Sequence, residues 1–425
     1  MPAPDPAGRT ALRRLAGTGL LLFLLLLPLA GLAASPAGAS EARYRQFVKA
    51  FWPVARKAGI SRATYESAFK GLTPDPEVIR KDAHQPEFVL PASYYHVLTV
   101  TDTRIRRGRE LLEEHRETLD AIERKYGVDR HVLLAIWGME TNFGTFMGGH
   151  DIIRALSTLA YTGRRRTFGR TQLLAALKML ERGYARREEM TGSWAGAVGY
   201  TQLIPTNFLK FAVDFDGDGR KDLWKTPADA LASTANYLAR AGWISGHSWG
   251  YEVRLPRRVS ARHAGRRNAR SLKAWQALGV KRVAGRAFPR LGDRAYLYLP
   301  AGRNGPAFLL LKNFRVIMRY NASHKYALSV AHLSDRYRGM GPFVTPWPDG
   351  VRALTEAERF EIQNHLLKLG HDIGEADGVL GSRTRAAIRA LQKEHGLKPQ
   401  DGFPTPKVLE FLRAKAAATA PPKAN

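Results

Sequence analysis

The chain contains no cysteine among its 425 residues. Disulfide bonds, thiolate metal ligands, a cysteine nucleophile and a lipid anchor on cysteine are therefore excluded. Acidic residues are also scarce, because 38 Asp and Glu stand against 66 Lys and Arg, which gives a formal net charge of +28. A charge balance of this size indicates an anionic partner such as nucleic acid, lipid headgroups or an acidic polymer.

The remaining composition is that of a globular protein. Hydrophobic residues make up 44% of the chain and charged residues 24%. These proportions exclude wholesale disorder, and the length suffices for one large domain or for two ordinary ones.

The amino-terminal residues 1–39 have the features of a secretory signal peptide. Three arginines precede an apolar run over 20–29, and small residues follow at 37–39, before Ser40. This order predicts export to the periplasm with cleavage near Ser40. An uncleaved membrane anchor is the alternative, but it needs about 20 apolar residues. Export argues against nucleic acid as the anionic partner and favours the cell wall.

The mature chain is predicted to be mainly α-helical, with a smaller β component. Proline and glycine over 341–353 indicate a stiff linker between a large domain, 40–340, and a small module, 354–415. We expect a disordered tail over 416–425. Apolar periodicity predicts helices over 101–126, from Asp129 onward and over 313–337, and short strands over 295–299 and 308–311.

Glu140 lies near the end of an apolar segment, L-L-A-I-W-G-M-E-T-N-F-G, at 133–144. It follows Ile136 by four residues and Leu133 by seven, which places it on the apolar face of a helix. Burial there should raise the pKa of its carboxyl group. A protonated carboxylic acid is the group that a glycosidase uses to protonate a leaving oxygen. Periodicity alone also allows a glutamate that points to solvent or pairs with an arginine.

A second segment, G-S-W-A-G-A-V-G-Y-T-Q-L-I-P-T at 192–206, is rich in small residues. Small residues permit a close approach of the backbone to a ligand or to another helix. Ser193, Tyr200 and Gln202 could form hydrogen bonds to a sugar, and Trp194 could supply an apolar platform. Tight helix packing around the glycines is the alternative interpretation.

Further motifs are V-D-F-D-G-D-G at 213–219, Asn313-Phe314, and Y-N-A-S at 320–323 followed by Tyr326-Ala327. Together with the two segments above, they resemble the lytic murein transglycosylase B family over roughly 45–338. The resemblance implies a lysozyme-like catalytic core with a small β-containing subdomain, acting on peptidoglycan. It implies that Glu140 is catalytic. It also implies a set of substrate-binding residues: Ser193, Tyr200, Gln202, Tyr320 and Asn321. Members attached to membranes carry a lipidated cysteine, so this chain resembles a soluble periplasmic form rather than a lipoprotein.

Glycoside hydrolysis ordinarily uses two carboxylates, and no second one lies within the Glu140 or Ser193 segments. The family resemblance implies that Glu140 acts first as an acid and then as a base. The bond between N-acetylmuramic acid and N-acetylglucosamine would then be cleaved with formation of a 1,6-anhydro ring. A hydrolytic muramidase and a non-catalytic wall-binding protein remain alternatives.

Asp214, Asp216, Asp218 and Arg220 occupy positions one, three, five and seven of a calcium-binding hand loop. Position twelve is Lys225 rather than glutamate. The family resemblance implies a longer loop with Asp229 as the closing carboxylate. A calcium ion here would be structural, and we expect the chemistry to require no cofactor. An Asp/Gly turn without metal is the alternative.

The last module resembles a three-helix peptidoglycan-binding domain. Its D-G-V-L-G-S-R-T motif at 377–384 precedes an amphipathic helix. Such a module would anchor the enzyme to the wall, although a bundle packed on the main domain is the alternative. The arginine-rich stretch 254–270 is either a solvated surface or attracts acidic stem peptides. We expect a monomer whose partners are peptidoglycan strands, with other cell-wall enzymes as further candidates.

Overall fold

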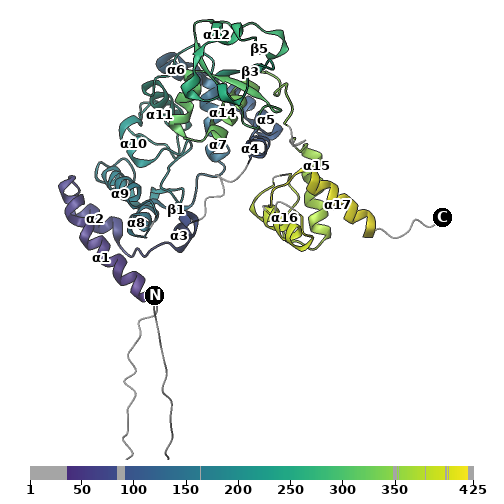
Figure 1. Ribbon diagram of the computed structural model, residues 1–425. Helices are drawn as coiled ribbons and strands as arrows, with labels where there is room; N and C mark the ends of the chain where they lie inside the picture. Colours follow the sequence, from purple (N-terminus) through teal and green to yellow (C-terminus); the bar gives the residue numbers. More distant parts are fainter. Residues whose placement is uncertain are drawn as a thin grey trace, which may run out of the picture.

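The computed structural model describes residues 36–83, 91–162, 164–347, 352, 354–378, 380–397, 400 and 402–419 (Figure 1). The expected signal peptide lies outside these residues except for 36–39, which begin the first helix. In the part of the chain that is described, no helix has the length and apolar character needed to cross a membrane.

Six helices around one core form the amino-terminal lobe. They are α1 (Pro36–Lys57), α2 (Arg62–Phe69), α3 (Pro76–Ala83), α8 (Ile152–Thr162), α9 (Arg166–Glu181) and α10 (Pro205–Phe211). Helix α8 lies at the centre of this lobe because apolar residues recur along it at helical spacing. Ile152, Ile153 and Leu156 are fully buried against neighbouring helices.

Seven helices form the central lobe. They are α4 (Ala92–Thr99), α5 (Asp102–Glu114), α6 (Arg116–Tyr126), α7 (Arg130–Thr141), α11 (Pro227–Arg240), α13 (Lys312–Tyr320) and α14 (His324–Tyr337). Asp129 begins α7 by accepting a hydrogen bond from the His131 backbone N–H at 2.9 Å. Residues 132–138 of α7 are all buried, so this helix is held on every side.

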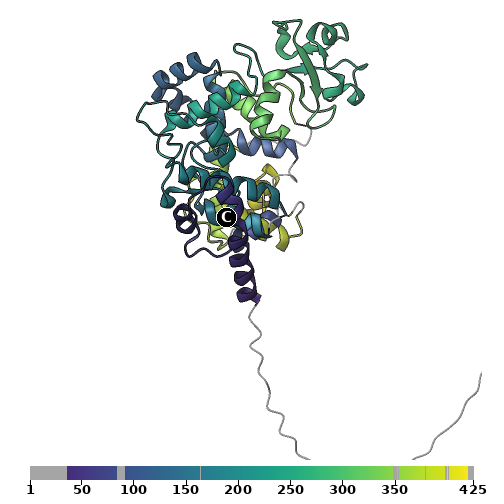
Figure 2. The same cartoon turned by 90° about the vertical axis from the view of Figure 1, so that its left-hand side faces the viewer.

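A five-stranded antiparallel sheet packs on the central lobe. Its strand order is β4 (Arg270–Ser271), β6 (Arg294–Tyr298), β7 (Ala307–Leu310), β3 (Gly250–Arg254) and β5 (Lys281–Arg282). Successive residues face opposite sides, so Phe308 packs on the helices while Leu309 packs toward Trp275 of α12 (Leu272–Ala277). Figure 2 shows this sheet subdomain, residues 250–311, far from α1.

The carboxyl-terminal module consists of α15 (Glu356–Lys368), α16 (Ser382–Glu394) and α17 (Pro406–Thr419) around a core of its own. Arg359 connects it to the central lobe, since its Nη2 donates to Thr103 Oγ1 at 2.8 Å. The segment before the module is docked as well. The Phe343 ring stacks on His332 with centroids 3.8 Å apart, and the Thr345 N–H donates to Glu252.

The predicted class is confirmed, because the protein is mainly helical with a small sheet and a three-helix carboxyl-terminal module. The two predicted strand segments are β6 and β7. The predicted single helix over 101–126 is wrong, because His115 (φ −109°, ψ 23°) separates α5 from α6.

The predicted helix over 313–337 is also two helices. Asn321 leaves the helical conformation, and its side-chain oxygen accepts the Ser323 N–H at 3.1 Å, which starts α14 in a new direction. At the carboxyl end, α17 extends through Ala416 to Thr419, into the segment expected to be disordered. Alanine, the strongest helix former, accounts for this extension.

Candidate active site

Glu140 lies in the last turn of α7 and is half-buried. The helix ends one residue later, at Thr141, because Asn142 and Phe143 adopt positive φ values of 49° and 61°. Two consecutive non-glycine residues in this conformation are costly unless the surroundings hold them. The end of α7 is therefore a fixed point from which the carboxyl group of Glu140 projects.

The side chain of Glu140 is held by Tyr326 of α14. The Tyr326 hydroxyl donates to Glu140 Oε1 at 2.7 Å. Burial raises the pKa of Tyr326 well above its usual value, and the nearby Glu140 charge raises it further, so the phenol stays protonated and remains a donor. Tyr326 was not among the predicted site residues, although Tyr326-Ala327 belongs to the motifs that resemble the family.

Tyr320, at the end of α13, lies on the boundary between the two lobes and packs against both cores. Its hydroxyl donates to the backbone carbonyl of Thr201. Burial, followed by the charge of Glu140, raises its pKa, so this phenol is also neutral. Tyr320 therefore connects the 199–202 turn to the helix that leads to Asn321.

Thr141 connects the end of α7 to the same turn. Its Oγ1 donates to the Tyr200 carbonyl at 2.6 Å and accepts the Gly144 N–H at 3.0 Å. The Tyr200 ring meets Trp137 edge-on, with centroids 5.5 Å apart. A Cβ on Gly144 would come within 2.4 Å of the Tyr200 ring, so only glycine fits there. These contacts set the position of Glu140 relative to the glycine-rich segment.

Gln202 adopts a positive φ of 54°, a strained conformation for a residue with a long side chain. Its Nε2 donates to the carbonyl oxygens of Met147, at 3.0 Å, and Gly199, at 2.8 Å. The amide nitrogen thus holds two loops together. Within the described residues Gln202 Oε1 accepts no hydrogen bond, which leaves that oxygen to accept from a ligand.

Ser193 lies in a turn directly after β2 (Thr191–Gly192), which pairs with β1 (His150–Asp151). Its Oγ accepts the Ala197 N–H at 3.0 Å. The loop before β1 approaches β2 so closely that a Cβ on Gly148 would lie 2.3 Å from the Gly192 carbonyl oxygen. The placement of Ser193 therefore depends on β1.

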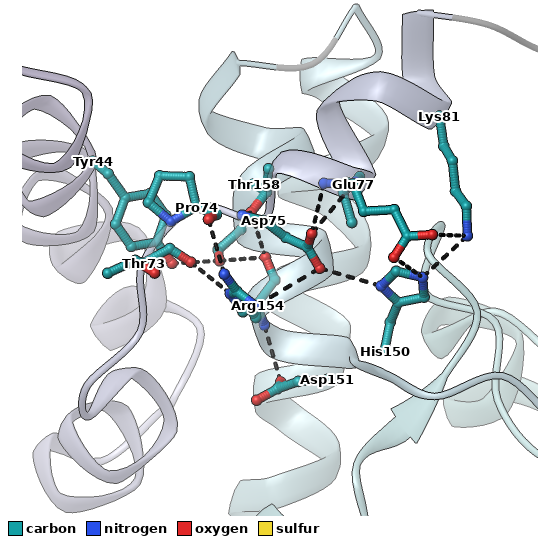
Figure 3. Close-up of polar contacts among 12 residues, drawn as sticks. Tyr44, Thr73, Pro74, Asp75, Glu77, Lys81, His150, Asp151, Arg154 and Thr158 are labelled. Atoms are coloured by element: carbon teal, nitrogen blue, oxygen red, sulfur yellow. Dashed lines mark hydrogen bonds and ion pairs between the residues drawn. The ribbon is translucent and has the colours of Figure 1, made fainter. Parts of the chain in front are cut away.

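A polar network around His150 and Asp75 supports β1 (Figure 3). His150 Nδ1 lies 3.2 Å from Asp75 Oδ2, and its Nε2 lies 3.3 Å from Lys81 Nζ. Burial opposes ionisation of Asp75, yet hydrogen bonds from His150 and from the Glu77 and Val78 N–H groups hold its pKa below its usual value. The network fixes α3 and β1 to each other.

Asn321 follows Tyr320 at the break between α13 and α14 and is half-buried. Its Oδ1 accepts the Ser323 N–H, so its Nδ2 is the group with which it could bind a sugar oxygen. Glu140, Tyr200, Gln202, Tyr320 and Asn321 are thus connected through direct contacts or adjacent residues, whereas Ser193 is related to them through the 192–202 segment.

The contacts that join Glu140, Thr141, Tyr200, Gln202 and Tyr320 come from uncharged groups: two phenols, a threonine hydroxyl and an amide. Among the residues that these contacts join, Glu140 is the one that carries a carboxyl group. The arrangement therefore suits a reaction in which a single acid gives up a proton and later recovers one.

The aspartate loop is a separate site. Carboxylate oxygens of Asp214, Asp216 and Asp218 lie within 4.8 Å of one another. Asp214 also accepts the Gly217 and Gly219 N–H groups, at 2.7 Å and 2.9 Å, which curls the loop around the three side chains. Oxygen donors in this arrangement fit a hard divalent cation such as calcium.

The other two predicted calcium ligands lie differently. Asp229 is fully buried, and its two oxygens accept the Phe215 N–H at 2.7 Å and the Asp222 N–H at 2.9 Å. Burial raises its pKa. The Arg220 N–H donates to Asp218 Oδ1 at 2.8 Å. Asp229 thus closes the loop through backbone contacts and stands outside the cluster of three carboxylates.

Comparison with known proteins gives two family matches. The family model described as "Transglycosylase SLT domain" matches residues 43–335. A second model, for a peptidoglycan binding domain, matches residues 355–412. The Membrane-bound lytic murein transglycosylase B of Escherichia coli (strain K12) is 31% identical over 246 residues, which are 56% of this chain. The chain spans 65% of the length of that relative.

Two solved structures are also similar. SltB3 from Pseudomonas aeruginosa, in complex with NAG-anhNAM-pentapeptide, is 47% identical with a TM-score of 0.70, covering 87% of this chain and 99% of that one. The Escherichia coli lytic transglycosylase Slt35 in complex with calcium is 27% identical with a TM-score of 0.60, covering 71% of this chain and 94% of that one.

Proposed function

This chain belongs to the transglycosylase SLT family, and we propose that it is a lytic murein transglycosylase. It would cleave the β-1,4 bond between N-acetylmuramic acid and N-acetylglucosamine in peptidoglycan and leave 1,6-anhydro-muramic acid ends. The observation that carries the proposal is the carboxyl group of Glu140, bound by the Tyr326 hydroxyl at 2.7 Å where the two lobes meet. The ligand in the SltB3 complex, NAG-anhNAM-pentapeptide, is a product of this kind.

The reaction needs one carboxyl group in two protonation states. Protonated Glu140 gives its proton to the glycosidic oxygen as the bond from that oxygen to the muramoyl anomeric carbon breaks, and the substrate's acetamido group stabilises the cationic centre. Glu140, now ionised, takes the proton of the muramoyl 6-hydroxyl while that oxygen bonds to the anomeric carbon. No water is consumed, and Glu140 ends protonated. The Tyr326 hydroxyl stabilises the ionised form between the two steps.

The surrounding residues would bind the glycan. We assign Ser193 to orientation of the acetamido group, and Gln202 Oε1 and Asn321 Nδ2 to sugar hydroxyls and carbonyls. Tyr200 and Tyr320 would hold these groups in place, since each joins elements of the site through its ring or hydroxyl. An enzyme of this kind positions its substrate before the chemical step.

Residues 1–39 would direct export to the periplasm, where the module at 354–415 anchors a monomer to the wall. Other cell-wall enzymes would be its candidate protein partners. Asp214, Asp216 and Asp218 would hold a structural calcium ion, as the converging oxygens and the calcium complex of Slt35 suggest. Nothing in the proposed chemistry requires that ion.

The experiment that tests the proposal is mass spectrometry of the sugars that the mature protein releases from purified sacculi. Anhydro-muropeptides should appear with the native chain and disappear with Glu140→Gln, while the melting temperature stays within about 2 °C. Hydrated reducing ends would show a muramidase instead. Co-sedimentation without release would show a wall-binding protein.

A further inference from the structure

The positive charge of this protein is concentrated in one part of the chain. Residues 253–334 contain 18 Lys and Arg but a single acidic residue, Asp293, so they carry +17 of the total formal charge of +28. This interval comprises most of the sheet subdomain, together with α13 and most of α14. The remaining charge is spread over four times as many residues.

Many of these arginines have a structural role that leaves their charge uncompensated. Six of them donate to backbone carbonyls: Arg258, Arg270, Arg282, Arg290, Arg294 and Arg303. A carbonyl oxygen satisfies the guanidinium donors without neutralising them. The interval therefore keeps a strong positive field even where its side chains are fixed.

One segment presents three of these cations, and one of the three contacts α13. We call 261–268 the basic loop; it comprises two short 3₁₀ turns, and its Arg262, Arg266 and Arg267 are exposed. Asn268 Nδ2 donates to the Arg262 and Ala264 carbonyls, both at 2.9 Å. The Gly265 N–H donates to Leu297 of β6 at 2.9 Å. The loop is thus held to the sheet.

Arg266 joins the basic loop to the site. Its guanidinium lies 6.0 Å from the Tyr296 ring centre and 3.3 Å from the sulfur of Met318, which is two residues before Tyr320. Helix α13 adds Lys312, Arg315 and Arg319, which recur at helical spacing and are exposed. Among the described residues, no ion pair to a carboxylate is found for these six cations.

We propose that the basic loop and the exposed face of α13 bind the free carboxylates of stem peptides on the glycan strand held at Glu140. This inference rests on the proposed function. It makes the sheet subdomain a second contact that favours peptide-bearing over peptide-free glycan. Arginine suits the role because its planar guanidinium binds a carboxylate through two hydrogen bonds.

The position of the cations favours the substrate over a lipid surface. They adjoin the segment that carries Tyr320 and Asn321, so a strand bound there brings its own peptides beside them. A bilayer docked on the same residues would cover that end of the site and compete with the glycan. Phospholipid binding is therefore the outcome that would contradict the proposal.

The test measures co-sedimentation in the Glu140→Gln background, in which the wall is not cleaved. The variant R262Q/R266Q/R267Q is compared with K49Q/R56Q/K57Q, which removes the same charge from exposed positions on α1. Each protein is mixed with intact sacculi, with sacculi stripped of peptides by an amidase, and with phosphatidylglycerol vesicles.

We expect the loop variant to bind intact sacculi about tenfold more weakly at low salt, with a smaller difference at 0.5 M NaCl. The preference for intact over stripped sacculi should disappear, and the α1 variant should keep it. Equal weakening by the two variants, or weaker binding to vesicles alone, would overturn the inference. If the loop variant does not fold, R315Q/R319Q tests the same surface. Failure of the proposed function would instead appear as absent anhydro products from the native chain.

Discussion

Replacing Tyr326 with phenylalanine tests how Glu140 is controlled. The change removes the hydroxyl that donates to Glu140 Oε1 at 2.7 Å and keeps the buried ring. A hydrogen bond to a charged group contributes about 1.5–3 kcal/mol, here to the ionised form of the carboxyl group. Because one pH unit corresponds to about 1.4 kcal/mol, loss of the bond should raise the pKa of Glu140 and move the basic limb of the kcat/KM profile up by one to two pH units.

The same loss should slow turnover. The carboxylate formed in the first step loses the Tyr326 hydrogen bond, so kcat should fall about ten- to hundredfold. The assay is release of anhydro-muropeptides from sacculi, followed between pH 4 and 9. Tyr44→Phe is the matched control, because its hydroxyl is bound to Ser157 Oγ at 2.6 Å in the amino-terminal lobe.

The control should lose some stability and keep the native pH profile. A Tyr326→Phe enzyme with the native profile and native kcat would refute the reasoning, since the hydrogen bond would then influence neither protonation state of Glu140. A profile that moves to lower pH would refute the sign of the effect, because it would mean that the phenol stabilises the protonated form.

Three further predictions concern the support of the site. Despite the opposing effect of burial, hydrogen bonds and charge hold the pKa of Asp129 at about 2, against a usual 3.8. Its ionised form should therefore add about 2 kcal/mol to the free energy of unfolding above pH 5, and this contribution should be lost as the pH falls from about 4 to 2. Urea unfolding of Asp129→Asn should lack this pH dependence. Calcium should raise the melting temperature of the native chain and leave the melting temperature of D216N/D218N unchanged. A native chain whose melting temperature does not respond to EDTA would count against the site. Gly148→Ala should lower the free energy of unfolding by about 1–3 kcal/mol in thermal unfolding and raise KM, because its Cβ would meet the Gly192 carbonyl. A Cβ on Gly149 has free space, so Gly149→Ala should keep near-native stability and KM.

The helical position of Glu140 was predictable because it depends on local features. Asp129 is a standard helix cap, and the apolar spacing from Leu133 to Ile136 places Glu140 on the buried face. The three helices of the carboxyl-terminal module were predictable for the same reason. Apolar periodicity, helix caps and the glycines that end helices all depend on residues that are close together in the sequence.

The partner of Glu140 was not predictable in this way. Tyr326 is 186 residues away along the chain, and the contact exists because α14 packs on α7. Apolar periodicity continues across Asn321, so the break that separates α13 from α14 was missed. It depends on one side-chain hydrogen bond to Ser323. The role of Gln202 in holding two loops is likewise a tertiary feature.

The choice of a tyrosine beside Glu140 follows from the chemistry proposed. With 66 Lys and Arg in the chain, a cationic partner for a carboxylate is the common solution. A guanidinium in the place of the Tyr326 hydroxyl would hold Glu140 ionised and prevent it from delivering a proton. A neutral phenol stabilises the carboxylate by less, so both protonation states stay within reach of one catalytic cycle. The exposed cations of the basic loop and of α13, in contrast, can attract substrate from outside the site.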